Sequence, residues 1–223
     1  MTSSETPGPE RRRFLPAAGH AWLLPFYDPL HRLLGGAAAL GELAEQAALE
    51  PGQRVLDIGC GTGTLTIQMC AREPGIDVVG LDPDPQALAR ARAKADRAGV
   101  CVTWQQGFAD ALPFPDASFD RVFSSFMFHH LDAEVKRGAL REVARVLRPG
   151  GSLHLLDFGG SGDHSHGLIG RLFHRSEHLR DNLEGRIPGL FEAAGLCDAH
   201  EVSHRSTLFG SIAWYRGDRR SSS

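Results

Sequence analysis

Short apolar runs alternate with longer segments of helical periodicity through the middle of the chain. Strands are predicted at residues 54–58, 77–82, 100–105, 119–124 and 153–157. Helices are predicted between them at residues 63–72, 84–98 and 133–147. Because this strand–helix rhythm produces parallel strands with helices packed on the sheet, it predicts an α/β fold whose ligands bind at the carboxyl ends of the strands.

Glycine and proline mark where the predicted helices end. Gly99 follows the helix at residues 84–98 and suits the C′ position, because glycine adopts the left-handed conformation without strain. Residues 149–151 read Pro-Gly-Gly and are expected to stop the helix at residues 133–147.

The first fifty residues differ in composition from the rest. Residues 1–13 are rich in Ser, Pro, Glu and Arg, so we expect a disordered tail. Residues 14–50 contain aromatic residues and prolines and are expected to form an N-terminal helical cap. Helices at residues 28–34 and 37–49 would build this cap.

The pattern changes again after the fifth strand. Residues 158–180 are rich in Gly and His and are expected to form a mobile loop that acts as a lid on the substrate. A helix is predicted at residues 177–194, followed by an antiparallel strand pair at residues 197–204 and 207–215. The prediction is a Rossmann-like, doubly wound sheet of about seven strands, mostly parallel with an antiparallel last strand and helices on both faces. The domain would span residues 51–216, with a disordered tail at residues 217–223.

Composition narrows the class of partner. The chain has 223 residues, 24 basic against 27 acidic side chains and a formal net charge of −3, a balance that indicates neither nucleic acid nor an anionic membrane. Apolar runs are too short to cross a bilayer, so no membrane insertion is expected. The four cysteines show no CxxC spacing and suit free thiols in a reducing compartment, which predicts a cytoplasmic protein.

The most informative stretch is Asp-x-Gly-x-Gly-x-Gly at residues 57–63, directly after the first strand. Glycines there let a ligand approach the backbone, and the following helix begins with free N–H groups. A phosphate cradle has no use for Asp57, whereas a ligand with an ammonium group or hydroxyl groups does. Asp82 ends the second strand, where a carboxylate can accept two ribose hydroxyls. Residues 108–114 add apolar walls where an adenine could lie.

These residues carry a resemblance to a known family. The chain resembles the class I S-adenosylmethionine-dependent methyltransferases, in the branch of the ubiquinone and menaquinone C-methyltransferases. The matching stretches are residues 55–63, 80–82, 109–116 and 140–151. The resemblance implies S-adenosyl-L-methionine as cofactor, S-adenosyl-L-homocysteine as product, and in-line displacement at the sulfonium with catalysis mainly by positioning.

The resemblance also implies roles for individual residues. The glycines would line the methionine and ribose, Asp57 would hold the amino group, Asp82 would accept the ribose hydroxyls, and the N–H of Ala109 would meet the adenine. Where the family often has an acid before that alanine, this chain has Phe108, so the adenine contact departs from the pattern. The full expected cofactor set is Asp57, Gly59, Cys60, Gly61, Gly63, Asp82, Pro83, Phe108, Ala109, Asp110 and Ser124.

A general base is needed only if the acceptor must lose a proton. Candidates are His129, His130 and Tyr27, with His154 as a further histidine on a strand. For each, a purely structural role is the alternative. Four clustered histidines also raise the question of a metal, but their spacing fits no common ligand pattern, and no metal site is expected. They are His164, His166, His174 and His178.

The acceptor is expected to be a small, partly apolar molecule. The fourth strand runs into Ser-Ser-Phe-Met at residues 124–127, not the Asn-Pro-Pro-Tyr type of motif that resembles methyltransferases of nucleobase amines. Two alternatives to a small-molecule methyltransferase stay open at this point. One is an NAD(P)-dependent oxidoreductase, although the chain lacks a Tyr-x-x-x-Lys pair, and the other is a non-catalytic S-adenosylmethionine-binding protein. The oligomeric state is also left open, including a homodimer.

Overall fold

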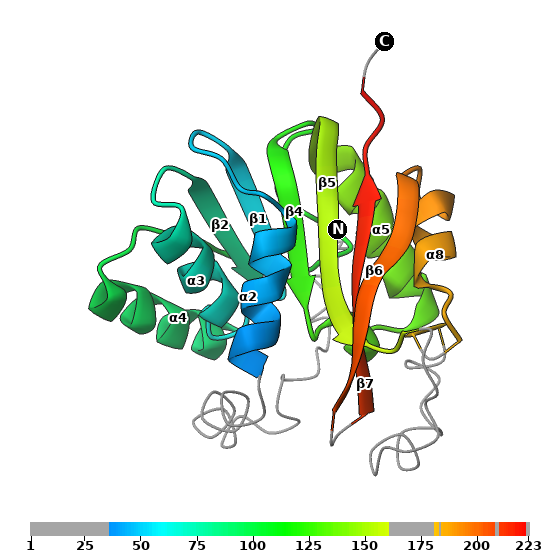
Figure 1. Cartoon of the computed structure of the whole chain (residues 1–223). Helices are drawn as coiled ribbons and strands as arrows, with labels where there is room; N and C mark the ends of the chain where they lie inside the picture. The colour runs from blue at the N-terminus through cyan, green and yellow to red at the C-terminus, as the bar shows by residue number, and fades with distance from the viewer. Residues whose placement is uncertain (1–35, 161–180, 183, 208–209, 222–223) are drawn as a thin grey trace, which may run out of the picture.

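The computed structural model describes residues 36–160, 181–182, 184–207 and 210–221, and these residues form a seven-stranded sheet with the order β3-β2-β1-β4-β5-β7-β6 (Figure 1). The strands are β1 (Arg54–Ile58), β2 (Asp77–Asp82), β3 (Thr103–Gln106), β4 (Phe119–Ser125), β5 (Leu147–Phe158), β6 (Cys197–Thr207) and β7 (Gly210–Asp218). The first five strands pair in parallel, and β7 is antiparallel to both of its neighbours. The predicted fold class is confirmed.

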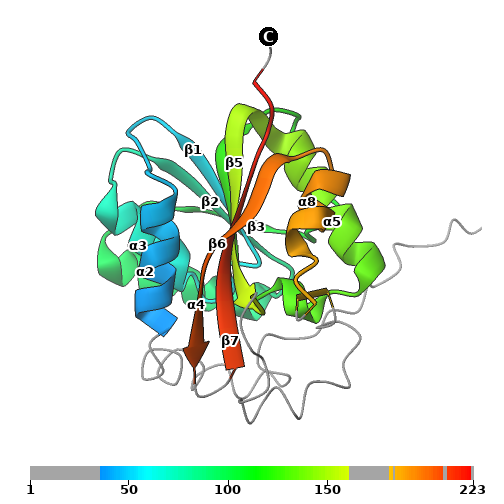
Figure 2. The ribbon, with the colours of Figure 1, turned by 45° about the vertical axis from the view of Figure 1, so that its right-hand side comes forward.

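Helices cover both faces of the sheet, as predicted. Figure 2 shows α2 and α3 on one face and α5 and α8 on the other. Each side has its own buried apolar cluster, one beneath α2 and α3 and the other beneath α5 and α8. The helical elements are α2 (Gly36–Gln46), α3 (Thr64–Arg72), α4 (Pro85–Ala98), the short 3₁₀ helix η2 (Phe128–His130), α5 (Ala133–Val146) and α8 (Ile187–Ala193).

Capping residues set the ends of α4 and α5. The carboxylate of Asp84 accepts the N–H of Gln86 at 2.8 Å, and Pro85 occupies the first turn of α4. The carboxylate of Asp132 caps α5 in the same way. Gly99, with φ of 67°, ends α4 in the left-handed conformation that the sequence predicts for it.

The prediction for the α5–β5 boundary is wrong in its details. The helix ends at Val146, and β5 begins at once with Leu147, so the Pro-Gly-Gly of residues 149–151 lies inside the strand. The N–H of Gly150 bonds the carbonyl of Arg219 at 2.9 Å, and a side chain on Gly151 would come within 2.8 Å of a backbone oxygen. Gly151 is therefore a glycine because β5 is closely flanked here, and Gly150 because its φ of 79° is one that glycine adopts without strain.

Three other elements are shorter than predicted. The strand at residues 100–105 begins only at Thr103, and α2 ends at Gln46. The long helix expected at residues 177–194 is interrupted, because a turn at Gly185, with φ of 66°, separates the helical residues 181–182 from α8, which has Pro188 in its first turn; residues 177–180 lie outside the described residues. No helix in the described part of the chain is long and apolar enough to cross a membrane.

The C-terminal end of the domain differs from its predicted bound, and the N-terminal predictions fall on residues that are not described. Strand β7 runs to Asp218, two residues past the expected domain end, and the N–H of Arg219 donates to the carbonyl of Gly151 at 2.8 Å, so the tail predicted at residues 217–223 is wrong at its start. The tail at residues 1–13, the helix at residues 28–34, and Tyr27 lie outside the described residues, as does most of the lid segment.

Candidate active site

The loop between β1 and α3 folds over the carboxyl end of β2. The N–H groups of Gly59 and Cys60 both donate to the carbonyl of Leu81, at 2.8 and 3.1 Å. The N–H of Gly61 donates to a carboxylate oxygen of Asp82 at 2.8 Å. Gly61 has φ of 53°, and a side chain there would meet no atom of the described residues within 4 Å. The open side of Gly61 is therefore where a ligand can reach the backbone.

The other two glycines of the motif are needed for packing. A side chain at Gly63 would come within 2.5 Å of the indole of Trp104, and the same ring lies against Gly80. A side chain at Gly59 would come within 2.4 Å of Cγ of Met127. Two glycines of the predicted cofactor motif thus make room for Trp104 and Met127, a reason that the sequence pattern does not reveal.

Asp57 is fully buried near the end of β1, and only one of its two carboxylate oxygens has a hydrogen-bond partner among the described residues. One oxygen accepts the hydroxyl of Thr66 at 2.6 Å, and the other has no partner among the described residues. Burial raises the pKa of Asp57 to about 7, an effect that the hydrogen bond from Thr66 opposes and the charge of Asp82 increases. An incoming ammonium group would satisfy the free oxygen and restore the charged form.

Asp82 and Cys60 are also buried at this edge of the sheet. The second oxygen of Asp82 accepts the N–H of Asp84 at 2.9 Å, and burial raises the pKa of this carboxyl. Each carboxylate oxygen has a further lone pair, so hydroxyl donors could still bind. Burial also raises the pKa of the Cys60 thiol, which keeps it protonated and unsuited to nucleophilic chemistry.

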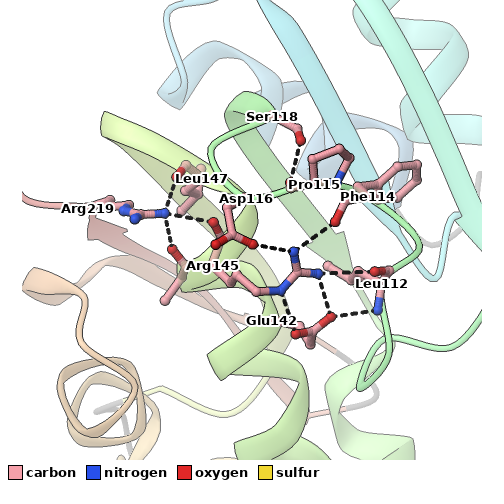
Figure 3. Close-up of polar contacts among 10 residues, drawn as sticks. Leu112, Phe114, Pro115, Asp116, Ser118, Glu142, Arg145, Leu147 and Arg219 are labelled. Carbon is pink, nitrogen blue, oxygen red and sulfur yellow. Dashed lines mark hydrogen bonds and ion pairs between the residues drawn. The ribbon is translucent and has the colours of Figure 1, made fainter.

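The segment expected to flank an adenine is fixed to α5 by one ion-pair network (Figure 3). The carboxylate of Glu142 accepts the N–H of Leu112 at 2.8 Å, and Arg145 donates to the carbonyl of Leu112 at 3.1 Å. Arg145 also reaches the carbonyl of Phe114 and the carboxylate of Asp116, both at 2.8 Å. The two stretches of the family resemblance at residues 109–116 and 140–151 are therefore one structural unit.

The remaining predicted cofactor residues occupy varied positions. Phe108 and Ala109 are partly exposed at the start of that segment. Cβ of Asp110 lies 3.1 Å from where a side chain on Gly138 of α5 would begin, so Asp110 packs against α5. The hydroxyl of Ser124 donates to the carbonyl of Ile58 at 3.1 Å within the sheet. The carbonyl of Pro83 accepts the side chain of Gln106 at 3.0 Å.

A histidine–carboxylate pair lies at the carboxyl ends of β4 and β5. Nδ1 of His129 is 2.6 Å from one oxygen of the fully buried Asp157, and the N–H of His129 donates to the other oxygen at 3.0 Å. The ring of His130 lies 4.0 Å from that of His129. When Nδ1 donates its proton to Asp157, a neutral His129 ring has its lone pair on Nε2, where a general base needs it. Two of the three predicted catalytic residues thus come together.

His154 has a structural role. Its ring is buried in β5, stacks on Phe123 and bonds the side chains of Gln46 at 3.1 Å and Ser152 at 2.9 Å. Burial lowers the pKa of His154 to about 3, so the ring is neutral. Of the described residues, none form a cluster of three side chains suited to a metal, and the four histidines considered for one lie outside them.

The sequence analysis missed three polar residues. Asp157 is the last residue of the fifth predicted strand, and its pairing with His129 spans 28 positions without a motif. Thr66 lies in the first turns of α3, three residues after the last motif glycine. Lys136 could have been found, because it shares the buried stripe of α5 with Ala139, Leu140 and Val143, at helical spacing.

Comparison with known proteins decides the family. A family model described as "Methyltransferase domain" matches residues 55–151. The demethylmenaquinone methyltransferase of Thermus thermophilus is 40% identical over 174 residues, covering 77% of each chain. The protein of the same name from Deinococcus radiodurans is 38% identical over 172 residues, covering 76% of this chain and 70% of that one. The chain belongs to the class I S-adenosylmethionine-dependent methyltransferases. Within them it falls in the branch of the quinone C-methyltransferases.

Solved structures support the fold. The YcgJ protein of Bacillus subtilis has a TM-score of 0.67 at 22% identity and covers 83% of this chain and 99% of its own. The [4+2]-cyclase SpnF is equally similar, with a TM-score of 0.66 at 22% identity, over 83% of this chain and 82% of its own. The fold alone therefore does not define the reaction. Family membership identifies the chain as an S-adenosylmethionine-dependent methyltransferase of a small molecule, which decides against an oxidoreductase and a non-catalytic binding protein.

Proposed function

We propose that this methyltransferase methylates a ring carbon of a quinol, the reduced and dihydroxylated form of a quinone, and releases S-adenosyl-L-homocysteine. A quinol ring is electron-rich, whereas a quinone ring is electron-poor and resists an electrophilic methyl group. The observation that carries this proposal is the His129–Asp157 pair, because removal of a hydroxyl proton makes the ring carbon more nucleophilic. Relatives named demethylmenaquinone methyltransferase support the acceptor class.

The residues of the β1–α3 loop suit the cofactor. The unpartnered oxygen of Asp57 fits an ammonium group, Asp82 fits the ribose hydroxyls, and the open face of Gly61 admits the backbone approach. These residues would hold S-adenosyl-L-methionine, which supplies a methyl group activated by its sulfonium. The N–H of Ala109 and the side chain of Phe108 would lie beside its adenine.

The acceptor side is aromatic. The rings of Phe126 and Phe158 lie 5.5 Å apart, and Phe158 meets the imidazole of His129 edge-on at 4.9 Å. Phe126 has φ of 51°, a conformation that bulky residues rarely adopt and that concentrates at functional sites. In the proposed reaction these rings exclude water, Nε2 of His129 takes the hydroxyl proton, and Asp157 stabilises the imidazolium. After the new C–CH₃ bond has formed, the ring C–H proton leaves to water and the imidazolium of His129 returns its proton to the ring oxygen, so one proton is released for each methyl group transferred.

Transfer of radiolabelled methyl from S-adenosylmethionine to reduced demethylmenaquinone tests the proposal, with mass spectrometry to locate the methyl group. The expected product carries the methyl on carbon. His129→Gln and Asp157→Asn should each lower kcat about 100-fold, the usual contribution of general base catalysis. His200→Gln, at an exposed histidine of β6, is the matched control. Methylation on oxygen, or full activity of His129→Gln, would contradict the proposal.

The cytoplasmic location, which suits four free thiols, stays a prediction, and the homodimer stays an open alternative.

A further inference from the structure

The ammonium group of Lys136 is buried close to the His129–Asp157 pair. Its Nζ donates to Oδ1 of Asn182 at 3.0 Å and lies 3.7 Å from a carboxylate oxygen of Asp181. Lys136 and Asn182 are both fully buried. A buried ammonium is costly, and an apolar side chain of similar length would pack against the apolar residues of this stripe with no desolvation penalty. Packing alone therefore does not account for a lysine at this position.

The contacts of Asn182 lead directly to the pair. Its Nδ2 donates to the carbonyl of Phe158 at 3.0 Å. The N–H of Phe158 donates at 2.8 Å to Oδ1 of Asp157, the same oxygen that lies 2.6 Å from Nδ1 of His129. Phe158 is thus held at both its N–H and its carbonyl, and its ring touches the imidazole.

Close packing makes this connection stiff. Gly159 has φ of 131°, and a side chain there would come within 2.4 Å of the backbone oxygen of Asn182. The end of β5 and residues 181–182 therefore lie in direct backbone contact. Lys136, on α5, contacts the side chain of Asn182. A shift of Asn182 would move Phe158 with it.

We propose that Lys136 and Asn182 are positioning residues for methyl transfer, which hold Phe158, and through it Asp157, so that Nε2 of His129 faces the acceptor. This inference rests on the proposed role of His129 as the base. Neither Lys136 nor Asn182 touches the reacting atoms.

Two variants separate this role from a contribution to stability. Lys136→Met removes the ammonium and keeps an unbranched apolar side chain. Asn182→Asp keeps an oxygen for Lys136 and replaces the N–H group that reaches Phe158 with a carboxylate oxygen, so it breaks the connection even if Lys136→Met fails to fold. Arg137→Met is the matched control, because it removes a positive charge from the exposed face of the same helix.

The first readout needs no acceptor. Nitrogen-15 NMR of the imidazole of His129, in protein saturated with S-adenosylhomocysteine, reports which ring nitrogen carries the proton. The second readout is kcat and KM with reduced demethylmenaquinone, and calorimetry of S-adenosylhomocysteine binding checks that the cofactor side is intact.

Wild type and Arg137→Met are expected to show the Nδ1–H tautomer alone. Lys136→Met and Asn182→Asp should show a mixture of tautomers and a kcat about tenfold lower, with KM and S-adenosylhomocysteine affinity within about twofold of wild type. An unchanged tautomer, or an unchanged kcat despite a changed tautomer, would overturn the proposal. If reduced demethylmenaquinone is not methylated by wild type, the proposed acceptor is wrong. The NMR result then still decides whether Lys136 and Asn182 position His129.

Discussion

Thr66 satisfies only one of the two carboxylate oxygens of Asp57, at 2.6 Å, although the whole side chain of Asp57 is buried. A ligand cation that reaches the free oxygen must compete with a proton, because burial raises the pKa of Asp57 to about 7. If the proposed cofactor ammonium binds here, we expect the cofactor affinity to depend on pH.

We expect the affinity for S-adenosylhomocysteine to fall roughly tenfold for each pH unit below about 7, since binding to the ionised carboxylate then releases a proton. Calorimetry between pH 5.5 and 7.5 measures this directly, in buffers of different ionisation enthalpy. Asp57→Asn should bind weakly at every pH and lose the dependence. An equally steep profile in that variant would place the titrating group elsewhere.

The same shift has a consequence for the ligand-free protein. A carboxyl whose pKa is raised on folding stabilises the folded state fully below its unfolded value of 3.8, and this contribution is lost as the pH rises through about 7. Asp57→Asn should therefore raise the free energy of unfolding at pH 8 by up to about 3 kcal/mol and change it little at pH 4. Urea denaturation of both proteins at the two pH values is the test.

Three glycines with positive φ should respond differently to alanine. Gly99→Ala introduces only backbone strain, about 1 kcal/mol, because its side chain would enter open space at the end of α4. Gly61→Ala should cost a similar amount in stability and in addition weaken S-adenosylhomocysteine binding at least tenfold. Gly63→Ala, which meets Trp104, should lower the free energy of unfolding by about 3 kcal/mol. Equal effects of Gly61→Ala and Gly99→Ala on binding would show that Gly61 does not face the cofactor.

Arg145 and Glu142 should control the order of residues 108–116. Arg145→Met leaves Glu142 and two backbone carbonyls without their partner, so we expect a loss of about 1–3 kcal/mol in stability and weaker S-adenosylhomocysteine binding. Arg141→Met, at an exposed arginine on the same helix, is the control.

Acid should weaken the same network. The hydrogen bond from Arg145 lowers the pKa of Glu142, so its contribution is present above the ordinary value of 4.5 and lost as the pH falls through the lowered one. The difference in melting temperature between wild type and Arg145→Met should therefore narrow as the pH falls below 4.5, and only the part due to the hydrogen bonds of Arg145 with the carbonyls of Leu112 and Phe114 should remain. A constant difference from pH 7 to pH 3 would count against the ion pair.

Arg219 should stabilise the domain although it lies past the last strand. Its guanidinium donates to the carbonyls of Ala144 at 2.6 Å and Arg145 at 2.8 Å, and also to that of Leu147, where α5 ends. A cation that satisfies final helix carbonyls suits the negative end of the helix dipole. Arg219→Ala is expected to lower the free energy of unfolding by about 2 kcal/mol, while Arg220→Ala, at an exposed neighbour, should have no measurable effect.

Patterns local in sequence were predictable, and contacts between distant segments were not. The strands that carry Asp57 and Asp82 at their carboxyl ends are apolar runs, so both their bounds and their shared edge of the sheet could be predicted. The start of β5 could not, because Pro-Gly-Gly ordinarily ends a helix without beginning a strand. Here the neighbouring strand and Arg219 supply the partners that make those residues part of a sheet.

The candidate site also combines residues that a local sequence pattern predicts with residues that only contacts between distant segments explain. The glycine motif reveals the cofactor side, but the reasons for Gly59 and Gly63 lie in Met127 and Trp104, which only the folded chain brings near them. The contact between Asp157 and His129 depends on the register of β5 beside β4, which the sequence does not show. Asp110 was expected beside the cofactor, and its position depends on the close approach of Gly138 in α5.

Strand β7 has a consequence for how the protein is made. Among the described residues it is the last strand, yet it lies between β5 and β6 and is the one strand that pairs with β6. A nascent chain that has emerged only as far as Thr207 therefore lacks this partner of β6, and β5, the strand that carries Asp157, has one unpaired edge. We expect the loop that holds Asp57 and Asp82 to fold during synthesis, before both edges of β5 are paired.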